Sequence, residues 1–319
     1  MKLEIGKNEA GQRLDKFLRK WLQDVPLSGI YRAIRKGDIK VNGKKAKEKY
    51  FLLEGDIVNA EYITSKETTS KFKRINNDFL KIIYEDSNML LVEKWPGVLV
   101  HSDKNSKDAT LTDYVLSHLY DRGEFNPEEE VTFTPSPCNR LDRNTSGIVI
   151  YGKNYESLKL LNEMIRERSI KKYYIALVIG KIKDGVYEGY IKKDRTNNKS
   201  SVSNALEKNS KKVSMRVKNV NTCGIYSLIE LELITGRSHQ LRAHLAYSGN
   251  AIVGDSKYGV SNINSFFYNK YGLDYQYLYA YKLNFRSCPE KLNYMENKTI
   301  TEGLPPILKK IRKDIFNKF

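Results

Sequence analysis

The sequence has few of the residues that build metal centres and disulfide frameworks. Its 319 residues include only three cysteines, which are far apart and form no C-x-x-C pair. This spacing predicts reduced thiols, and neither a disulfide framework nor a zinc ribbon. His239 and His244 are five residues apart, which would place them about 140° apart around a helix axis. We therefore expect no two-histidine metal site.

Other signature segments are also missing. The chain contains no glycine-rich phosphate loop and no dinucleotide fingerprint, so we expect no nucleotide cofactor. No apolar run approaches the ~20 residues that a membrane-spanning helix needs, and no amino-terminal hydrophobic segment has the length of a signal peptide. We therefore expect a cytoplasmic protein that has no membrane partner.

Positive charge is what the sequence has in excess. The formal net charge is +17, which points to a polyanionic partner. The length and the hydrophobic content of 40% are enough for one large domain and a smaller one.

The first 62 residues combine helical apolar spacing with basic side chains. A first helix is expected from Arg13 to Leu22, and a second around Ile30 and Ile34. The Asn42-Gly43 pair is a strong hairpin signal. This region holds 14 Lys and Arg against nine Asp and Glu, a net charge of +5. The basic side chains that crowd the second helix and the hairpin are Arg32, Arg35, Lys36, Lys44 and Lys45.

Beyond a polar segment near residues 64–71, strands become frequent. We expect an α+β class with a mainly antiparallel mixed sheet and flanking helices, among them Tyr155–Arg168 and a carboxy-terminal amphipathic helix. Residues 192–216 hold eight Lys and Arg and two Asp and Glu, and they predict a loop or irregular hairpin beside a cleft, either touching the backbone of the polyanionic partner or merely solvated. The expected strands are Leu80–Tyr84, Met89–Val92, Ile148–Tyr151, Tyr173–Ile179 and Tyr226–Leu233.

The segment from Asn139 to Gly147 places one carboxylate, Asp142, between Arg140 and Arg143 and just before an apolar strand. Two neighbouring cations favour an ionised acid, as a nucleophile requires. From the residues alone, a structural or solvated aspartate is the more common outcome.

This segment resembles the H-R-L-D-x-x-T-S-G signature of the RluA-type pseudouridine synthases, enzymes that isomerise uridine in RNA, with Asn139 in place of histidine. The resemblance implies that Asp142 is the nucleophile. It also implies that Arg140 occupies the space that a flipped-out uridine leaves in the RNA.

Two further segments match the same family in the same order. Lys172–Val178 is similar to its K-x-Y-x-A-L-V strand and makes Tyr174 the tyrosine that stacks on the freed uracil and accepts the C5 proton. Leu233–His244, followed by Gly254–Gly259, is similar to its T-G-R-T-H-Q-I-R segment and V-G-D-x-x-Y-G turn, and makes Arg242 the active-site arginine that keeps Asp142 ionised.

Weaker matches carry departures from the family pattern. In the N-K-P-x-G-x-x-V-H turn, Glu93 and Trp95 replace Asn and Pro. In the L-H-A-x-x-L strand, Tyr279 replaces histidine. Together the matches run from about residue 80 to residue 288.

The amino-terminal region is similar to the S4 RNA-binding domain, which implies that its basic residues contact RNA phosphates. We expect an S4-like domain at 1–62, a linker at 63–77 and a pseudouridine synthase domain at 78–319. The stretch Val25–Arg32 resembles the RluC branch and implies large-subunit ribosomal RNA, or its precursor particle, as the partner of a monomeric enzyme.

Three alternatives stay open to different degrees. The chain could modify tRNA, or it could be an S4-type binding protein without catalytic activity. The presence of Asp142, Tyr174 and Arg242 together argues against a silent site. Use of the charge on DNA is disfavoured, because the sequence shows no recognition-helix pattern.

Overall fold

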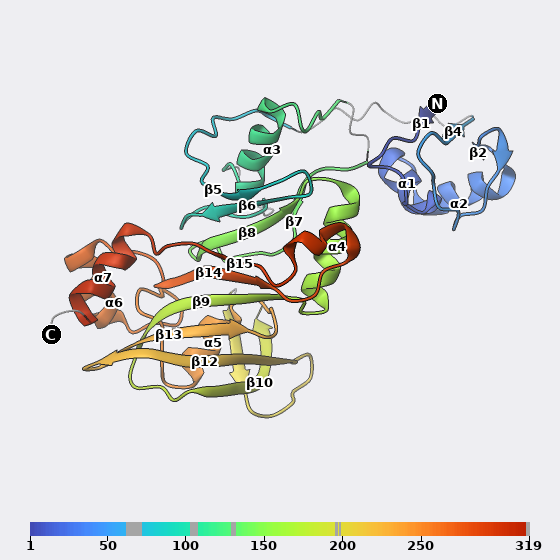
Figure 1. Cartoon of the computed structure of the whole chain (residues 1–319). Coiled ribbons are helices and arrows are strands. Elements are labelled where there is room, and N and C mark those ends of the chain that lie inside the picture. Colours follow the sequence, from blue (N-terminus) through green and yellow to red (C-terminus); the bar gives the residue numbers. More distant parts are fainter. Residues whose placement is uncertain (62–71, 103–107, 129–131, 195–196, 198, 317–319) are drawn as a thin grey trace.

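Two sheets divide the chain in the computed structural model, which describes residues 1–61, 72–102, 108–128, 132–194, 197 and 199–316. A four-stranded sheet belongs to the amino-terminal domain and an 11-stranded sheet to the remainder (Figure 1). The expected α+β class is confirmed. Within the described part of the chain, every helix is too short or too polar to cross a lipid bilayer.

The amino-terminal domain packs two helices against an antiparallel sheet in the order β1-β4-β2-β3. Its core is formed by the apolar faces of both helices, with Leu14, Phe17 and Ile30 fully buried. The helices lie where the apolar spacing predicts them. The elements are β1 (Lys2–Glu4), α1 (Leu14–Trp21), α2 (Leu27–Lys36), β2 (Ile39–Val41), β3 (Lys44–Lys45) and β4 (Ile57–Ala60).

Two turns bring the basic residues of this domain together. Helix α2 ends at Gly37, whose φ of 86° is left-handed. The predicted hairpin joins β2 to β3 through Asn42 and Gly43, with φ values of 50° and 75°. Because Gly37 has no Cβ, the side chain of Lys45 lies directly against it. The end of α2 and the hairpin therefore form one basic edge.

The large sheet has the order β11-β10-β12-β13-β9-β14-β8-β6-β5. The pairs are antiparallel apart from β8 and β14, which run parallel. All the strands expected from the sequence are present, with small shifts of their ends. The elements are β5 (Ile82–Glu85), β6 (Met89–Lys94), β7 (Ser136–Pro137), β8 (Ser146–Gly152), β9 (Ile170–Ile179), β10 (Gly185–Asp194), β11 (Lys199–Ser203), β12 (Lys211–Cys223), β13 (Tyr226–Leu233), β14 (Leu278–Phe285) and β15 (Thr299–Thr301).

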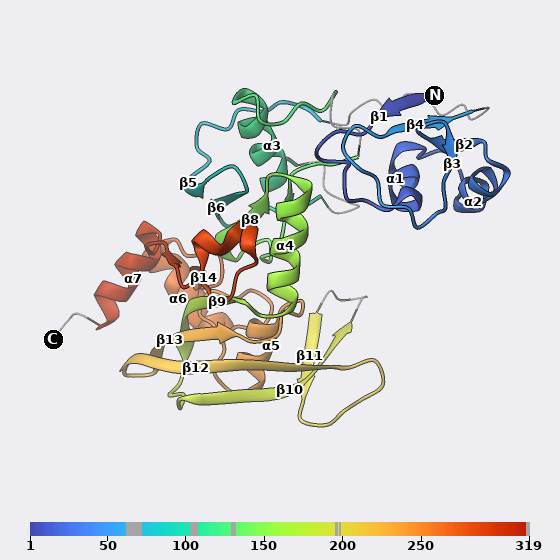
Figure 2. The ribbon, with the colours of Figure 1, turned by 45° about the vertical axis from the view of Figure 1, so that its right-hand side comes forward.

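Helices cover both faces of this sheet (Figures 1 and 2). Helices α3 and α5 pack on the face that carries Tyr174, Ala176 and Val178, which we call the front face. The remaining helices pack on the back face, against alternate residues such as Leu177 and Ile150. The helices are α3 (Leu111–Asp121), α4 (Tyr155–Arg166), α5 (Gln240–Tyr247), α6 (Ser261–Tyr271), the 3₁₀ helix η1 (Glu290–Met295) and α7 (Pro306–Phe316).

Two segments differ in form from the sequence-based expectation. Residues 192–216 were expected to form a loop or irregular hairpin, but β10, β11 and β12 are regular antiparallel strands across most of this segment. Residues 63–71 of the expected linker lie outside the described residues. Residues 72–77 of the same expected linker contact α3, where the Ser117 hydroxyl accepts a hydrogen bond from the Ile75 amide at 3.0 Å.

Gly147 is the residue that allows β8 and β14 to run side by side. Its φ is 123°, and a Cβ at this position would overlap the backbone of Ala280, its partner on β14. Any other residue would therefore be strained and would also clash.

We expect Gly147→Ala to destabilise the catalytic domain by about 2–4 kcal/mol, because backbone strain and overpacking each contribute about 1–3 kcal/mol. The urea midpoint of the catalytic-domain transition would measure this loss. Gly236→Ala is the matched control, because a Cβ there would meet nothing within 4 Å. Equal midpoints for the two variants would show that the close approach of the strands does not require glycine.

Candidate active site

Asp142 lies on the loop that leads into β8, whose first two residues end the motif segment. The loop is held in place by Asn139, whose side chain accepts a hydrogen bond from the Ile150 amide at 2.8 Å and donates one to the Ile148 carbonyl at 3.2 Å. The Thr145 amide also closes a turn on the Asp142 carbonyl. Asn139, which stands where the family has histidine, therefore has a structural role, because its buried side chain binds the backbone of β8.

Lys94, at the end of β6, ties a neighbouring turn to the same loop. Its Nζ donates to the carbonyls of Trp95, Val98 and Arg143 at 2.7–3.0 Å, and its side chain is fully buried. Burial lowers the pKa of this ammonium to about 7, while the charge of Asp142 opposes the shift. Three carbonyl acceptors also favour the ammonium, because only the charged form has three N–H donors.

A buried arginine connects Asp142 to a second carboxylate. Arg242 on α5 donates from Nη1 to Oδ2 of Asp142 at 2.9 Å, and from Nε and Nη2 to both oxygens of Asp255 at 2.7 and 2.9 Å. The Asp255 side chain is fully buried, whereas that of Asp142 is 27% exposed. No described residue donates a hydrogen bond to Oδ1 of Asp142. The series of ion pairs therefore ends in a partly exposed carboxylate, one oxygen of which receives no hydrogen bond from the described residues.

Opposite charges shift the pKa values of Arg242 and Asp255, the two buried groups of this ion-pair network. Burial alone would raise the pKa of Asp255, but the hydrogen bonds and charge of Arg242 overcome it and lower that pKa. The amides of Lys257 and Tyr258 add further donors to the Asp255 carboxylate. The carboxylates of Asp255 and Asp142 in turn raise the pKa of Arg242 against the effect of burial.

Tyr174 completes one wall of the site from β9. It belongs to the front-face core and is 4% exposed. Burial, with a smaller contribution from the negative charge of Asp142, raises the pKa of its phenol. The tyrosine, the aspartate and the arginine therefore meet at the front face of the sheet, although they come from distant segments.

His239, just before α5, is held in an unusual backbone conformation beside this group. Its φ is 55°, a left-handed value that costs energy for a residue other than glycine. Its Nδ1 lies 2.9 Å from the hydroxyl of Tyr258, which accepts a hydrogen bond from the Ser200 amide. The Tyr258 ring also stacks against the Arg242 guanidinium at 5.3 Å.

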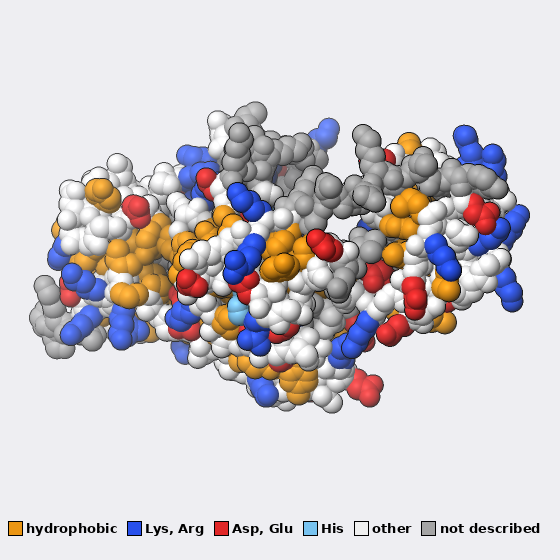
Figure 3. All heavy atoms as spheres, turned by 90° about the horizontal axis from the view of Figure 1, so that it is seen from above, with side chains coloured by type: hydrophobic (Ala, Val, Ile, Leu, Met, Phe, Trp, Pro, Cys, Tyr) orange, Lys and Arg blue, Asp and Glu red, His pale blue; other side chains and the backbone are white. Residues whose placement is uncertain are grey.

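The remaining site residues named by the sequence lie at the surface. Arg140 is exposed on the Asp142 loop, and its charge, second to burial, lowers the pKa of His101. The basic residues of the amino-terminal domain are also exposed: Arg32, Arg35, Lys36, Lys44 and Lys45. Figure 3 shows Lys and Arg side chains along the outer edge of this domain, on the right of the view.

Sequence reasoning assigned no role to Asp255, Lys94, Tyr258 or His239. Asp255 and Tyr258 were within a quoted turn segment, and His239 within the segment that contains Arg242. Their charged and aromatic side chains marked them as candidates for a functional role, but only the folded chain shows that they contact Arg242 or the Asp142 loop. Lys94 was part of a motif whose neighbours, Glu93 and Trp95, depart from the family pattern.

Comparison with known proteins identifies the family to which this chain belongs. The chain matches the sequence model of RNA pseudouridylate synthases over residues 88–247 and that of S4 domains over residues 12–58. The chain therefore belongs to the RNA pseudouridylate synthase family and carries an S4 domain. It is an RNA pseudouridine synthase, and its macromolecular partner is RNA.

Full-length relatives agree with this assignment. A protein of Mycoplasma capricolum described as an uncharacterized RNA pseudouridine synthase is 35% identical, over 95% of this chain and 97% of its own length. The ribosomal large subunit pseudouridine synthase C of Vibrio parahaemolyticus is 32% identical, over 98% and 96%. The human RNA pseudouridylate synthase domain containing 4 has the same fold, with a TM-score of 0.57 and 22% identity over 74% of this chain and 92% of that chain.

The ion pair between Arg242 and Asp255 predicts a pH-dependent stability. The lowered pKa of Asp255 means that its contribution is fully present above the unfolded value of 3.8 and is lost as the pH falls through the lower folded value. At pH 7, Asp255→Asn leaves a buried cation undercompensated, and we expect a loss of about 3–5 kcal/mol. Urea unfolding from pH 7 to pH 3 measures the difference from the native protein.

The difference between the two unfolding curves should shrink as the pH falls below 3.8, because the unfolded chain then binds a proton at Asp255 that the folded protein binds only at lower pH. Asp78→Asn, at an exposed aspartate, is the control and should follow the native protein at every pH. A constant difference between Asp255→Asn and the native protein across the whole range would contradict the ion-pair account.

Proposed function

We propose that this enzyme converts specific uridines of large-subunit ribosomal RNA into pseudouridine, with Asp142 as the nucleophile. The observation that carries the mechanism is the Asp142 carboxylate, whose side chain is 27% exposed and which buried Arg242 holds near buried Tyr174. The relative from Vibrio parahaemolyticus, named for the ribosomal large subunit, supports the substrate. The proposal includes a monomer that acts in the cytoplasm, on ribosomal RNA or its precursor particle.

In this mechanism a uridine leaves the RNA stack and enters the front-face site, which makes its glycosidic bond accessible. Asp142 attacks either C1′ of the sugar or C6 of the base. The bond between N1 and C1′ breaks, the base rotates, and C5 bonds to C1′ as the bond to Asp142 is released. The C5 proton leaves and N1 gains a proton, so the product is an isomer of uridine. Arg242 compensates the charge of Asp142 before the attack and holds its carboxylate in one orientation.

Tyr174 has two roles in the proposal. Its ring stacks on the freed uracil, and its phenol oxygen accepts the C5 proton. The raised pKa keeps the phenol protonated at rest, partly because of the negative charge of Asp142. Burial is the larger cause of the raised pKa and persists after Asp142 has formed the adduct, so in this proposal the phenol releases its own proton to solvent before its oxygen accepts the C5 proton.

The exposed basic residues position the RNA. Arg140, two residues before the nucleophile, fills the place that the extruded base leaves. The S4 domain, residues 1–62, contacts phosphates through the basic edge formed by α2 and the β2–β3 hairpin. Its Gln12 and Lys20 donate to the hydroxyl and carbonyl of Thr132, each at 3.0 Å, which holds this domain beside the catalytic domain of residues 78–319.

Asp142→Asn removes the nucleophile and keeps the size of the side chain. We expect the affinity for RNA to stay within about twofold of that of the native protein. Pseudouridine formation should be lost, with a fall in rate of at least about 10³-fold, as for the loss of other covalent nucleophiles. Chemical mapping of pseudouridine after single-turnover reactions measures the product. Asp78→Asn should retain full activity, and turnover by Asp142→Asn above background would exclude Asp142 from the role.

Replacing Arg32, Arg35 and Lys36 together by Gln should weaken RNA binding without a change in sequence preference. Each lost phosphate contact lowers the salt dependence of log Kd by about 0.7–0.9, so we expect the slope to fall by roughly 2–3. Titrations at several salt concentrations measure this slope. Replacing Lys309, Lys310 and Arg312 of α7 by Gln is the matched control, and an equal effect of both variants would contradict an S4-based RNA site.

The substrate is tested by pseudouridine mapping of total RNA from cells with and without this protein. We expect specific sites in large-subunit ribosomal RNA to vanish and tRNA sites to persist, because the relatives named for a substrate are ribosomal enzymes. Restoration by the native gene and not by the Asp142→Asn gene is the control. Loss of tRNA sites alone would overturn the ribosomal assignment and leave the chemistry intact.

A further inference from the structure

A pocket that the proposed reaction does not use lies at the end of β6 and the beginning of β8. Its volume is about 480 Å³, which is within the range of small-molecule sites. Glu93 on β6 and Ser146 on β8 point to the back face of the large sheet, because they alternate with the front-face residues Val92 and Val149.

The other side of the pocket belongs to the front face. Phe79 and Trp95 both contact the ring of Tyr114 on α3, a front-face helix. The pocket therefore lies at the ends of the two strands, between elements of both faces.

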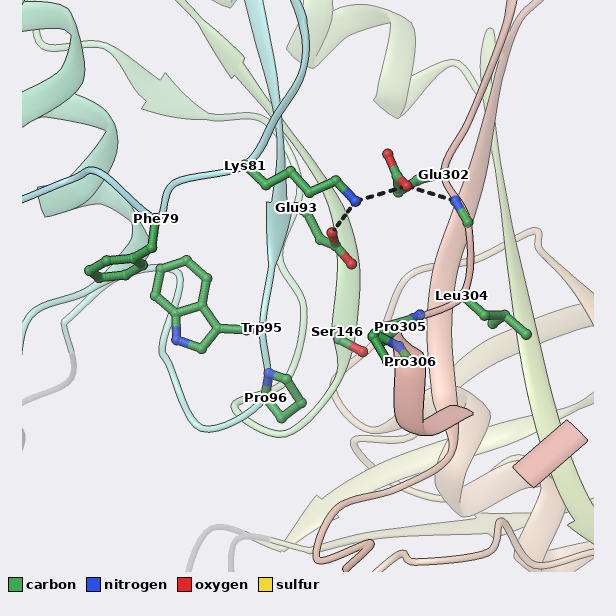
Figure 4. Close-up of a pocket in the computed structure, with 11 residues that line it drawn as sticks. Phe79, Lys81, Glu93, Trp95, Pro96, Ser146, Glu302, Leu304, Pro305 and Pro306 are labelled. Carbon is green, nitrogen blue, oxygen red and sulfur yellow. Dashed lines mark hydrogen bonds and ion pairs between the residues drawn. The ribbon is translucent and has the colours of Figure 1, made fainter. Parts of the chain in front are cut away.

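One wall of the pocket is aromatic and the other consists of prolines. Phe79 and Trp95 contact each other edge to face, with ring centroids 5.2 Å apart. Pro305 and Pro306, at the beginning of α7, face them across the opening, and Pro96 lies below (Figure 4). This arrangement suits a flat ring, because the walls are apolar and largely rigid.

The polar end of the pocket is richer in acceptors than in donors. The ammonium of Lys81 lies 2.9 Å from an oxygen of Glu93 and 2.9 Å from an oxygen of Glu302. The Tyr279 hydroxyl donates to the other oxygen of Glu93 at 2.7 Å. Two carboxylates and one ammonium give a formal charge of one negative unit, in a protein whose net charge is +17. Anionic groups such as RNA phosphates are therefore disfavoured in this pocket.

A buried hydroxyl at the pocket lacks a partner. Ser146 is 1% exposed, and its Oγ makes no hydrogen bond within the part of the chain that the structure describes. Figure 4 shows this oxygen directed toward Pro305 and Pro306. An unpaired buried hydroxyl is destabilising, and a ligand group that reaches it would remove this cost.

Three of the four named departures from the family pattern lie in or next to the pocket; the fourth, Asn139, does not line it. Glu93, Trp95 and Tyr279 replace the usual asparagine, proline and histidine. In the folded protein Glu93 and Trp95 line the pocket, and the Tyr279 hydroxyl donates to Glu93. Tyr279 and Glu93, two of these replaced positions that are far apart in the sequence, are thus hydrogen-bonded to each other.

We propose that this pocket binds a small aromatic amine in its protonated form. The ring lies between Trp95 and the two prolines, the ammonium donates to Glu93 and Glu302, and the amine or a ring N–H reaches the Ser146 hydroxyl. This binding proposal does not depend on the proposed catalytic mechanism.

Tryptamine is the probe, titrated by calorimetry into the full-length protein after nuclease treatment, because residual RNA would itself bind an amine. We expect Glu302→Gln to weaken tryptamine binding about tenfold and Ser146→Ala about threefold, from the loss of one charge-assisted and one neutral hydrogen bond. Lys81→Gln should tighten binding at least about threefold, because it removes the competing cation. A gain in affinity is a result that a misfolded variant would not give.

Glu230→Gln is the matched control, because Glu230 pairs with Lys282 at 2.8 Å outside the pocket and its side chain is 21% exposed, against 19% for Glu302. It should leave the affinity unchanged. Indole-3-propionate, with the same ring and a negative charge, should bind at least about tenfold more weakly than tryptamine. No binding of tryptamine at about 10 mM, or the same affinity in Glu302→Gln, Lys81→Gln and the native protein, would overturn the proposal.

Discussion

The active site depends on one buried guanidinium shared by two carboxylates. Arg242 donates two hydrogen bonds to Asp255 and one to Asp142. Asp255 therefore fixes the arginine, and the arginine fixes Asp142 while leaving one of its oxygens unbound. A lone buried arginine without Asp255 would be costly and poorly oriented. The reactivity proposed for Asp142 thus rests on a residue that does not contact the substrate.

The central strands serve two faces of the sheet at once. On the front face they carry Tyr174 and lead into the Asp142 loop, and on the back face they line the pocket through Glu93 and Ser146. Lys94 lies between two pocket residues in the sequence and holds the Asp142 loop through the Arg143 carbonyl. The same segments therefore support the proposed active site and the positions that depart from the family pattern.

Apolar periodicity was enough to predict most helices and strands, because each buries one face and the spacing shows which. It was less accurate for residues 192–216, where Lys, Ser and Asn favour a loop or irregular hairpin, but β10 pairs in regular antiparallel register with both β11 and β12. Asp142, Tyr174 and Arg242 were predicted through family resemblance, and the structure brings them together. The role of Asp255 was not predictable, because the arginine that it orients is identified only by tertiary contacts.

Covalent capture by Asp142 is the central claim, and mass spectrometry of the quenched enzyme tests it most directly. Excess enzyme is mixed with RNA that carries its target uridine, denatured within one turnover and digested with nuclease and protease. The account predicts a nucleoside mass on the peptide that contains Asp142, absent when the target uridine is replaced by cytidine. A uridine-dependent adduct on any other side chain would contradict it.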